Sequence, residues 1–429
     1  MTGSAYKRAD WLATTNIYEV NTRQYTAAGT FNAFSAELPR LKDMGVEVLW
    51  FMPIHPIGEK NRKGAMGSYY CIKDFKAVNP EFGTAEDFKT LIKKAHELGM
   101  KVILDWVANH AAWDNVWTAD HPDYFERDAE GNFRAPYDWT DVIQIDHSSE
   151  AEQEAMIDAM KCWVTDFNID GFRADLAHLT PLAFWKKART AIEPLKENLF
   201  WLAETEEINY HEVFDASFTW EWMHKTEDYC KGNTDMNGLK EVLHRYYGAF
   251  SASAYRMYFT SNHDENSWNG TEYEKYGEMA KAFAVFSLTW NGIPLIYSGQ
   301  ELPNLKKLEF FDKDVIAWTG NNELHSFYKI LLKLRKRNPA LRACDPSVNS
   351  FLVTPSIDHC VFAYLRKNGD NEVLVFLNLS SDAISFTVKD NIVDGSFEDI
   401  FTGTMHNLNA DSVIEMPPGG FRVFERNDK

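Results

Sequence analysis

Short apolar runs alternate with longer amphipathic segments from the N-terminus to about residue 340. The apolar runs are rich in β-branched and aromatic residues, which is typical of buried strands. Eight such runs are predicted as strands: 17–26, 45–53, 101–106, 169–175, 199–204, 216–220, 256–261 and 293–297.

Between most of these strands, apolar residues recur at helical spacing, which predicts helices. The clearest case opens at Thr84, a predicted N-cap with Asp87 three residues later, and closes at Gly99. Further helices are predicted over 150–167, 181–191, 237–249, 273–289 and 323–337. Eight β/α units in order indicate an α/β fold, a (β/α)₈ TIM barrel.

Two segments do not follow this alternation of strands and helices. Residues 110–147 are rich in Trp, Asp, His and Pro and lack a helical period, which predicts a long loop subdomain after the third strand. The tail contains alternating apolar runs separated by turns, which predicts a C-terminal antiparallel β-sandwich. The expected domains are therefore a barrel over 1–109 and 148–341, the subdomain over 110–147, and the sandwich over 342–429.

The charge balance narrows the possible partners. The 429 residues carry 44 Lys and Arg against 63 Asp and Glu, a formal charge of −19. This acidity disfavours nucleic acid and anionic membranes as partners but not a neutral polysaccharide. No apolar run approaches the roughly 20 residues of a membrane span.

The cysteines bear on metal and disulfide sites, and the N-terminus bears on localisation. Five widely spaced cysteines without a CxxC pair argue against a zinc site or a disulfide framework. Met1–Ser4 shows no hydrophobic signal region, so the chain is either cytoplasmic or exported with its signal removed.

Carboxylates stand at the ends of four predicted strands: Asp105, Asp175, Glu204 and Asp264. The active site of a β/α barrel lies at these carboxyl ends. Any single one could equally be a helix cap or a solvated charge, but four together favour a catalytic site. Arg173 lies two residues before Asp175 and so points the same way, which would keep that carboxylate ionised and suit a nucleophile.

These segments resemble the short motifs of the α-amylase family. The resemblance rests on Asp105–His110, on Gly171–Asp175, on the segment around Glu204 and on Ser261–Asp264. Stretches at Gly45–Pro56, Tyr70–Asp74 and Gly292–Glu301 match as well. The likeness runs through the whole barrel in order, and the tail resembles the C-terminal sandwich of that family.

The resemblance implies roles for the matching positions. Asp175 would be the nucleophile, Glu204 the general acid/base, and Asp264 the group that binds sugar hydroxyls and stabilises the transition state. The remaining roles implied are substrate contacts by His110 and His263, stacking by Tyr70, orientation of Asp175 by Arg173, and support from the site floor by Asp105.

Two positions leave the assignment of roles open. Glu206 shares strand parity with Glu204, so it is a second candidate for the acid/base. Asn109 matches a position that often binds structural calcium, but no dense acidic loop accompanies it, so calcium stays open. No organic cofactor is expected.

The leading hypothesis is a retaining hydrolase of α-1,4-glucosidic bonds in starch-like glucans or maltooligosaccharides. An α-glucanotransferase on the same fold is the nearest alternative. A catalytically inactive carbohydrate-binding protein and a metal-dependent barrel hydrolase are weaker, since the acids are present and no His-x-His strand end is. Protein partners, oligomeric state and endo or exo action stay open.

Overall fold

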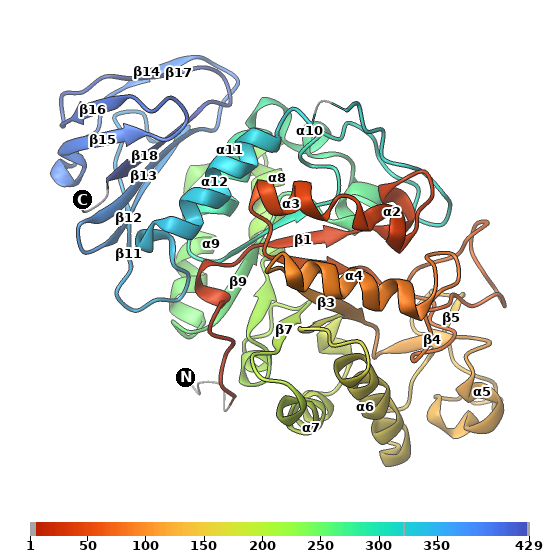
Figure 1. Ribbon diagram of the computed structural model, residues 1–429. Helices are drawn as coiled ribbons and strands as arrows, with labels where there is room; N and C mark the ends of the chain where they lie inside the picture. The colour runs from red at the N-terminus through yellow and green to blue at the C-terminus, as the bar shows by residue number, and fades with distance from the viewer. Residues whose placement is uncertain (1–5, 321, 427–429) are drawn as a thin grey trace.

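A computed structural model describes residues 6–320 and 322–426. A barrel surrounded by helices occupies the centre, with the small β4–β5 subdomain and the C-terminal sheet at opposite ends (Figure 1). Met1–Ser4, where the sequence predicts no signal region, lie outside the described residues.

The eight predicted barrel strands form a closed parallel barrel in the order β1-β10-β9-β8-β7-β6-β3-β2. The prediction of a (β/α)₈ barrel is therefore confirmed. The strands are β1 (Ile17–Val20), β2 (Val48–Phe51), β3 (Lys101–Trp106), β6 (Gly171–Ala174), β7 (Phe200–Ala203), β8 (Ala216–Phe218), β9 (Tyr255–Tyr258) and β10 (Ile293–Tyr297).

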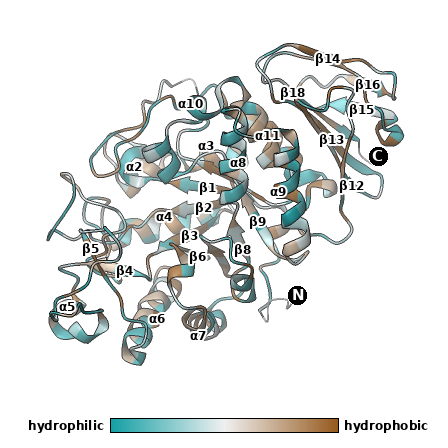
Figure 2. Cartoon of the chain, turned by 180° about the vertical axis from the view of Figure 1, so that it is seen from behind, coloured by the Kyte–Doolittle hydropathy of each residue, from teal (hydrophilic) through white to brown (hydrophobic). Residues whose placement is uncertain are grey.

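Helices cover the outside of the barrel, so its strands are buried on both faces. Their ribbons carry hydrophobic and hydrophilic residues in alternation, as amphipathic helices require (Figure 2). Five predicted helices are confirmed within a few residues: α4 (Ala85–Glu97), α6 (Glu150–Thr165), α7 (Leu182–Ile192), α9 (Met236–Ala249) and α12 (His325–Arg337). Among the described residues, no helix is long and apolar enough to cross a bilayer.

Two predicted elements need correction, and several helices were not predicted. The first strand ends at Val20 because the Asn21 side chain accepts the Gln24 N–H and caps a helix instead. The helix predicted over 273–289 divides because Gly277, at φ 55°, ends its first part. The sequence pattern also missed a helix after β8 and two short ones after β1. The helices concerned are α1 (Thr22–Tyr25), α2 (Phe31–Ser35), α3 (Leu38–Met44), α8 (Trp220–Cys230), α10 (Glu272–Tyr276) and α11 (Ala280–Thr289).

The segment between β3 and β6 carries its own small antiparallel pair, β4 (His110–Ala112) with β5 (Val142–Gln144), and one helical turn, α5 (Trp117–Asp120). It projects from the carboxyl end of β3, the end that carries Asp105. The subdomain is therefore placed beside the mouth of the barrel, where a substrate would enter.

The tail forms a sandwich of antiparallel strands, as predicted. A six-stranded sheet in the order β11-β12-β13-β18-β15-β16 faces the β14–β17 pair across an apolar core that includes Phe376, Phe386, Met416 and Phe424. Its strands are β11 (Asn349–Leu352), β12 (Val361–Asn368), β13 (Asn371–Asn378), β14 (Ile384–Phe386), β15 (Gly395–Asp399), β16 (Met405–Leu408), β17 (Ile414–Met416) and β18 (Phe421–Arg426).

The start of α4 offers a test of local stability. Thr84 Oγ1 accepts the Asp87 N–H at 3.1 Å, and Asp87 Oδ2 accepts the Thr84 N–H at 2.8 Å. Thr84→Ala removes one half of this capping box, so we expect the free energy of unfolding to fall by roughly 0.5–2 kcal/mol. Urea unfolding followed by circular dichroism measures the change.

Thr90 is the matched control, because it is an exposed threonine in the middle of the same helix. Thr90→Ala should leave stability unchanged or raise it slightly, since alanine favours helix more than threonine does. An equal loss in both variants would show that the cap contributes nothing specific.

Candidate active site

The polar residues predicted at the strand ends meet at one end of the barrel. Asp105 and Arg173 lie within β3 and β6, and their backbones are paired across these two strands. Asp175 follows β6 directly, and Glu204 follows β7 directly. Parallel neighbouring strands therefore bring three carboxyl groups and one guanidinium to the same level.

Arg173 is the centre of this group and is fully buried. Its Nη1 donates to Asp105 Oδ1 at 2.8 Å and to Asp175 Oδ1 at 2.9 Å, and its Nη2 lies 2.8 Å from Glu204 Oε2. The guanidinium also lies over the Trp50 ring, 4.9 Å from its centroid. One cation thus fixes the positions of Asp175 and Glu204 relative to each other.

In Asp175 and in Glu204, one carboxyl oxygen makes the protein contacts. Among the described residues, the contacts of Asp175 engage Oδ1, through Arg173. Those of Glu204 engage Oε2, which also accepts the Leu176 N–H at 2.7 Å. Asp175 Oδ2 and Glu204 Oε1 make no hydrogen bond or ion pair within the described part of the chain.

Burial sets the protonation of this pair. It raises the pKa of Asp175 well above its usual range and outweighs the lowering effect of Arg173. Contrary to the expectation from sequence, Arg173 alone does not keep this carboxyl group ionised. Burial also raises the pKa of Glu204, and the nearby Asp264 charge adds to the increase while Arg173 again opposes it. Because each carboxylate repels the other, the pair favours holding one shared proton over full ionisation.

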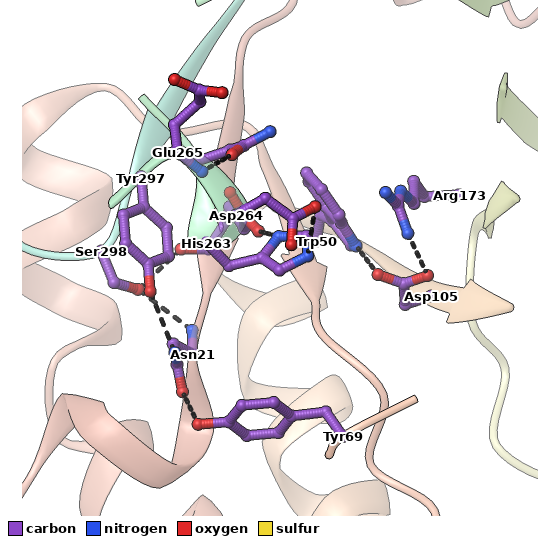
Figure 3. A network of polar contacts seen from close by, with 12 residues as sticks. Asn21, Trp50, Tyr69, Asp105, Arg173, His263, Asp264, Glu265, Tyr297 and Ser298 are labelled. Atoms are coloured by element: carbon purple, nitrogen blue, oxygen red, sulfur yellow. Dashed lines mark hydrogen bonds and ion pairs between the residues drawn. The ribbon is translucent and has the colours of Figure 1, made fainter. Parts of the chain in front are cut away.

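His263 links the opposite side of the site to the barrel wall. Its Nδ1 lies 2.5 Å from Glu19 Oε1, and its Nε2 lies 2.7 Å from the Tyr70 hydroxyl and 3.2 Å from Asp264 Oδ2. Tyr70 in turn donates to Asp105 Oδ2 at 3.1 Å. Figure 3 shows Trp50 between His263 and the Arg173–Asp105 pair, and its indole N–H donates to Asp105.

The charges of this second group follow from its contacts. Burial alone would lower the pKa of His263, but Asp264 and Glu19 raise it well above its usual value, so the ring is a cation. For Asp264, burial raises the pKa, and His263, Arg173 and a hydrogen bond from Trp268 outweigh it and lower the pKa below the usual value. Asp264 is therefore an ionised carboxylate, 35% exposed at the site.

His110 lies next to this network but differs in charge. Burial lowers its pKa to about 4, partly offset by Asp141 and by a hydrogen bond with the Tyr70 backbone. The Trp139 ring lies against it edge-on, 5.5 Å between centroids. At neutral pH the ring is uncharged, and it is placed to form hydrogen bonds without adding charge.

Glu206, the second candidate acid, has a different environment. Its Oε1 accepts from Tyr246 and, at 3.0 Å, from Arg256 Nη2, while Oε2 accepts the Glu221 N–H at 2.8 Å. These partners lie on α8, α9 and β9. Glu206 therefore holds the outer helices to the barrel, whereas Glu204 contacts Arg173.

The residues at Asn109 do not fit a calcium ion. The Gln144 amide nitrogen lies among three oxygens, 2.8 Å from Asn109 O, 3.0 Å from Asn109 Oδ1 and 3.3 Å from Ile145 O. A calcium ligand offers oxygen, and here an N–H donor occupies the point where these oxygens converge. Among the described residues, no group of three or more His, Cys, Asp or Glu is placed to hold a metal ion. Calcium at Asn109 therefore gains no support.

Two residues of the site were not predicted from the sequence, Glu19 and Trp50. Glu19 is a fully buried carboxyl group in the middle of β1 and partners His263. An acid inside an otherwise apolar strand was a usable signal for it. In the sequence, Trp50 has the pattern of an ordinary core residue. The sequence does not indicate that its indole N–H donates to Asp105.

The part of the chain that carries the site matches a known protein family. A family profile described as "Alpha amylase, catalytic domain" matches residues 14–142 and 131–345. A second profile, "Maltogenic Amylase, C-terminal domain", matches residues 351–423. Together the two profiles cover most of the chain.

Individual relatives agree with these profiles. The chain is 25% identical to a cyclomaltodextrinase from Geobacillus thermopakistaniensis, over 92% of this chain and 70% of that protein. It is 26% identical to an alpha-amylase from Haloarcula japonica, over 96% of this chain and 63% of that protein. The chain therefore spans about two thirds of the length of these curated relatives.

Solved structures resemble the chain over nearly its full length. An alpha-amylase from Lactobacillus plantarum superposes with a TM-score of 0.87 at 30% identity, covering 96% of this chain and 99% of the other. A noncanonic maltogenic alpha-amylase from Thermotoga neapolitana gives a TM-score of 0.88 at 29% identity, covering 97% and 100%.

The amide at Gln144 leads to a prediction about metal removal. Because an internal N–H satisfies the oxygens around Asn109, a chelator should leave activity intact and lower the melting temperature by a few degrees at most. Activity and differential scanning calorimetry with and without EDTA measure this. Complete inactivation that added calcium reverses would contradict it.

Gln144→Ala provides the complementary measurement. This variant should melt at a lower temperature than the wild type without any chelator, because it leaves the buried Asn109 oxygens without their donor.

Proposed function

The chain belongs to the alpha-amylase family of glycoside hydrolases, and we propose that it is a retaining enzyme that cleaves α-1,4-glucosidic bonds in starch-like glucans or maltooligosaccharides. The observation that carries this proposal is the contact of the buried Arg173 guanidinium with both Asp175 and Glu204. Such an arrangement supplies an oriented nucleophile and a proton donor side by side.

In the first step, Asp175 Oδ2 attacks the anomeric carbon of the sugar. The bond from that carbon to the leaving oxygen breaks, and Glu204 transfers its proton to the leaving oxygen through Oε1. Arg173 keeps Asp175 oriented through Oδ1, and in the reactive state the one proton that the pair shares is on Glu204.

In the second step, the Glu204 carboxylate removes a proton from water. That water attacks the anomeric carbon, the bond to Asp175 breaks, and the nucleophile returns to its starting state. Two displacements at one carbon restore the α configuration of the substrate.

The surrounding groups suit a sugar that gains positive charge as it reacts. The ionised Asp264 would hold two hydroxyl groups and stabilise that charge, and the His263 cation keeps it ionised. The neutral His110 would donate to another hydroxyl, and the Tyr70 ring would lie under the sugar. Asp105 acts through Arg173 and Tyr70, so we assign it to positioning.

Stereochemistry tests this proposal directly. Retaining enzymes hold the two carboxyl groups about 5–5.5 Å apart, and inverting ones about 6.5–9.5 Å apart to admit a water. Because Asp175 and Glu204 share one guanidinium, we expect the α-anomer to appear first when a maltooligosaccharide is hydrolysed. Proton NMR during the first minutes of reaction measures the order of appearance.

Asp175→Asn is the matched control for that measurement. It should fold normally and lose activity on the order of 10⁴-fold or more, because no covalent glycosyl-enzyme can form. A β-anomer that appears first, or a variant that keeps a tenth of the rate, would remove the nucleophile assignment. Products longer than the substrate would instead favour the glucanotransferase alternative.

The acid/base role gives a second prediction. Glu204→Gln should lower hydrolysis of maltooligosaccharides about 10²–10⁴-fold, since the leaving oxygen then receives no proton. It should slow glycosyl-enzyme formation from α-glucosyl fluoride far less, because fluoride leaves without protonation. Steady-state and burst kinetics on the two substrates separate these effects.

Glu206→Gln is the control, because glutamine can still accept from Tyr246 and Arg256. This variant should keep most of its activity on both substrates. If the two variants behaved in the reverse manner, the acid/base role would move to Glu206.

A further inference from the structure

Trp268 is an unusual tryptophan in this protein. It follows Asp264 by four residues and is 50% exposed. Among the described residues, it is the one tryptophan in the group of large exposed hydrophobic side chains. An exposed indole beside an active-site carboxylate indicates a contact surface for a ligand with an apolar face.

The backbone around Trp268 is held in a rare conformation. Glu265–Asn269 form one turn of π-helix, which occurs frequently at functional sites. Asn262 Oδ1 accepts the Glu265 N–H at 2.8 Å, and the buried Glu265 carboxylate binds Lys275 at 2.6 Å and Asn269 at 2.8 Å. The turn is therefore anchored before and after Trp268, which places its ring in a defined position.

The loop after β10 is hydrogen-bonded to the π turn that carries Trp268. Asn266 Oδ1 accepts the Leu308 N–H at 3.0 Å, and Asn266 Nδ2 donates to Lys306 O at 3.1 Å. Lys307 Nζ donates to Trp268 O at 3.1 Å. The π turn and this loop thus form one unit.

A continuous row of rings joins Trp268 to the centre of the site. The Trp268 ring lies 5.1 Å from Phe310, and Phe310 lies nearly parallel to Tyr70, with 6.3 Å between centroids and 13° between planes. Tyr70 is stacked with His263 at 5.3 Å. The row Tyr70–Phe310–Trp268, which we call the aromatic wall, begins where the reacting sugar would lie and ends in solvent.

The order of the strands shows on which side of the reacting bond this wall lies. In the closed barrel, β7 is opposite β1, and β1 lies between β2 and β10. Glu204 follows β7, whereas Tyr70 and Phe310 come from the connections after β2 and β10. Trp268 comes from the connection after β9 and lies on this side through its contact with Phe310. The aromatic wall therefore lies across the barrel mouth from the proton donor, on the side of the sugars that stay attached to Asp175.

We propose that Trp268 is the stacking platform for the glucose unit next to the reacting one, on the side that remains bound to the enzyme. The inference rests on the proposed function. The faces of a glucose ring carry C–H groups that pack on an indole, and Trp268 is the exposed end of the aromatic wall. Its hydrogen bond to Asp264 ties this platform to the reacting sugar's own site.

Two activated substrates test the proposal without needing Glu204 as acid. α-Glucosyl fluoride occupies only the reacting position, whereas α-maltosyl fluoride adds one sugar over Trp268. The measured quantity is the ratio of kcat/KM for maltosyl fluoride to that for glucosyl fluoride. Trp268→Ala should lower this ratio about tenfold, as expected for losing one buried ring contact. Any general effect through Asp264 cancels in the ratio.

Two further variants complete the design. Trp268→Phe keeps a flat ring but not the indole N–H, so it should keep most of the ratio while both rates fall. Tyr247→Ala, an 88% exposed aromatic residue on α9, should leave the ratio and both rates unchanged.

An unchanged ratio in Trp268→Ala, or an equal fall in Tyr247→Ala, would overturn the inference while leaving the proposed function in place. If the wild-type protein hydrolysed neither fluoride, the proposed function would fail, and this inference with it.

Discussion

The buried positive charge of Arg173 is the constraint on which the site depends. A guanidinium removed from water inside a barrel is costly unless carboxylates and hydrogen bonds compensate it. Asp105, Asp175 and Glu204 provide that compensation from three neighbouring strands. Their positions are therefore set by the need to neutralise one cation, and the geometry that catalysis requires follows from the same contacts.

The balance of charge extends this argument to the proton. Five carboxyl groups, those of Glu19, Asp105, Asp175, Glu204 and Asp264, surround two cations, Arg173 and His263. Acids exceed bases in a volume with little water, so full ionisation is unfavourable and a proton is retained. Asp264 is kept ionised by its contact with His263, which leaves the proton to the carboxyl groups around Arg173. The excess of acid thus favours a protonated carboxyl group within this cluster.

Local patterns in the sequence predicted what depends on chain-neighbouring residues. The presence and order of the barrel strands, the Thr84 cap and the shared parity of Arg173 and Asp175 all follow from patterns among residues close in sequence. The pattern failed where conformation depends on single φ angles or on partners distant in sequence. Gly277 divides a helix through one positive φ, and Glu19 gains its role from a histidine 244 residues away.

The residues proposed for the chemical step and those proposed for binding the neighbouring sugar lie on different parts of the structure. Arg173 and its carboxylates lie on strands or directly after them, where the barrel backbone fixes their spacing. Trp268 and Phe310 lie on connections that are held together by hydrogen bonds between loops, such as those of Asn266. On the proposed assignment, a change in these loops would alter sugar binding without moving the guanidinium. Conversely, a change in Arg173 disturbs Asp105, Asp175 and Glu204 at once, because all three contact the same cation.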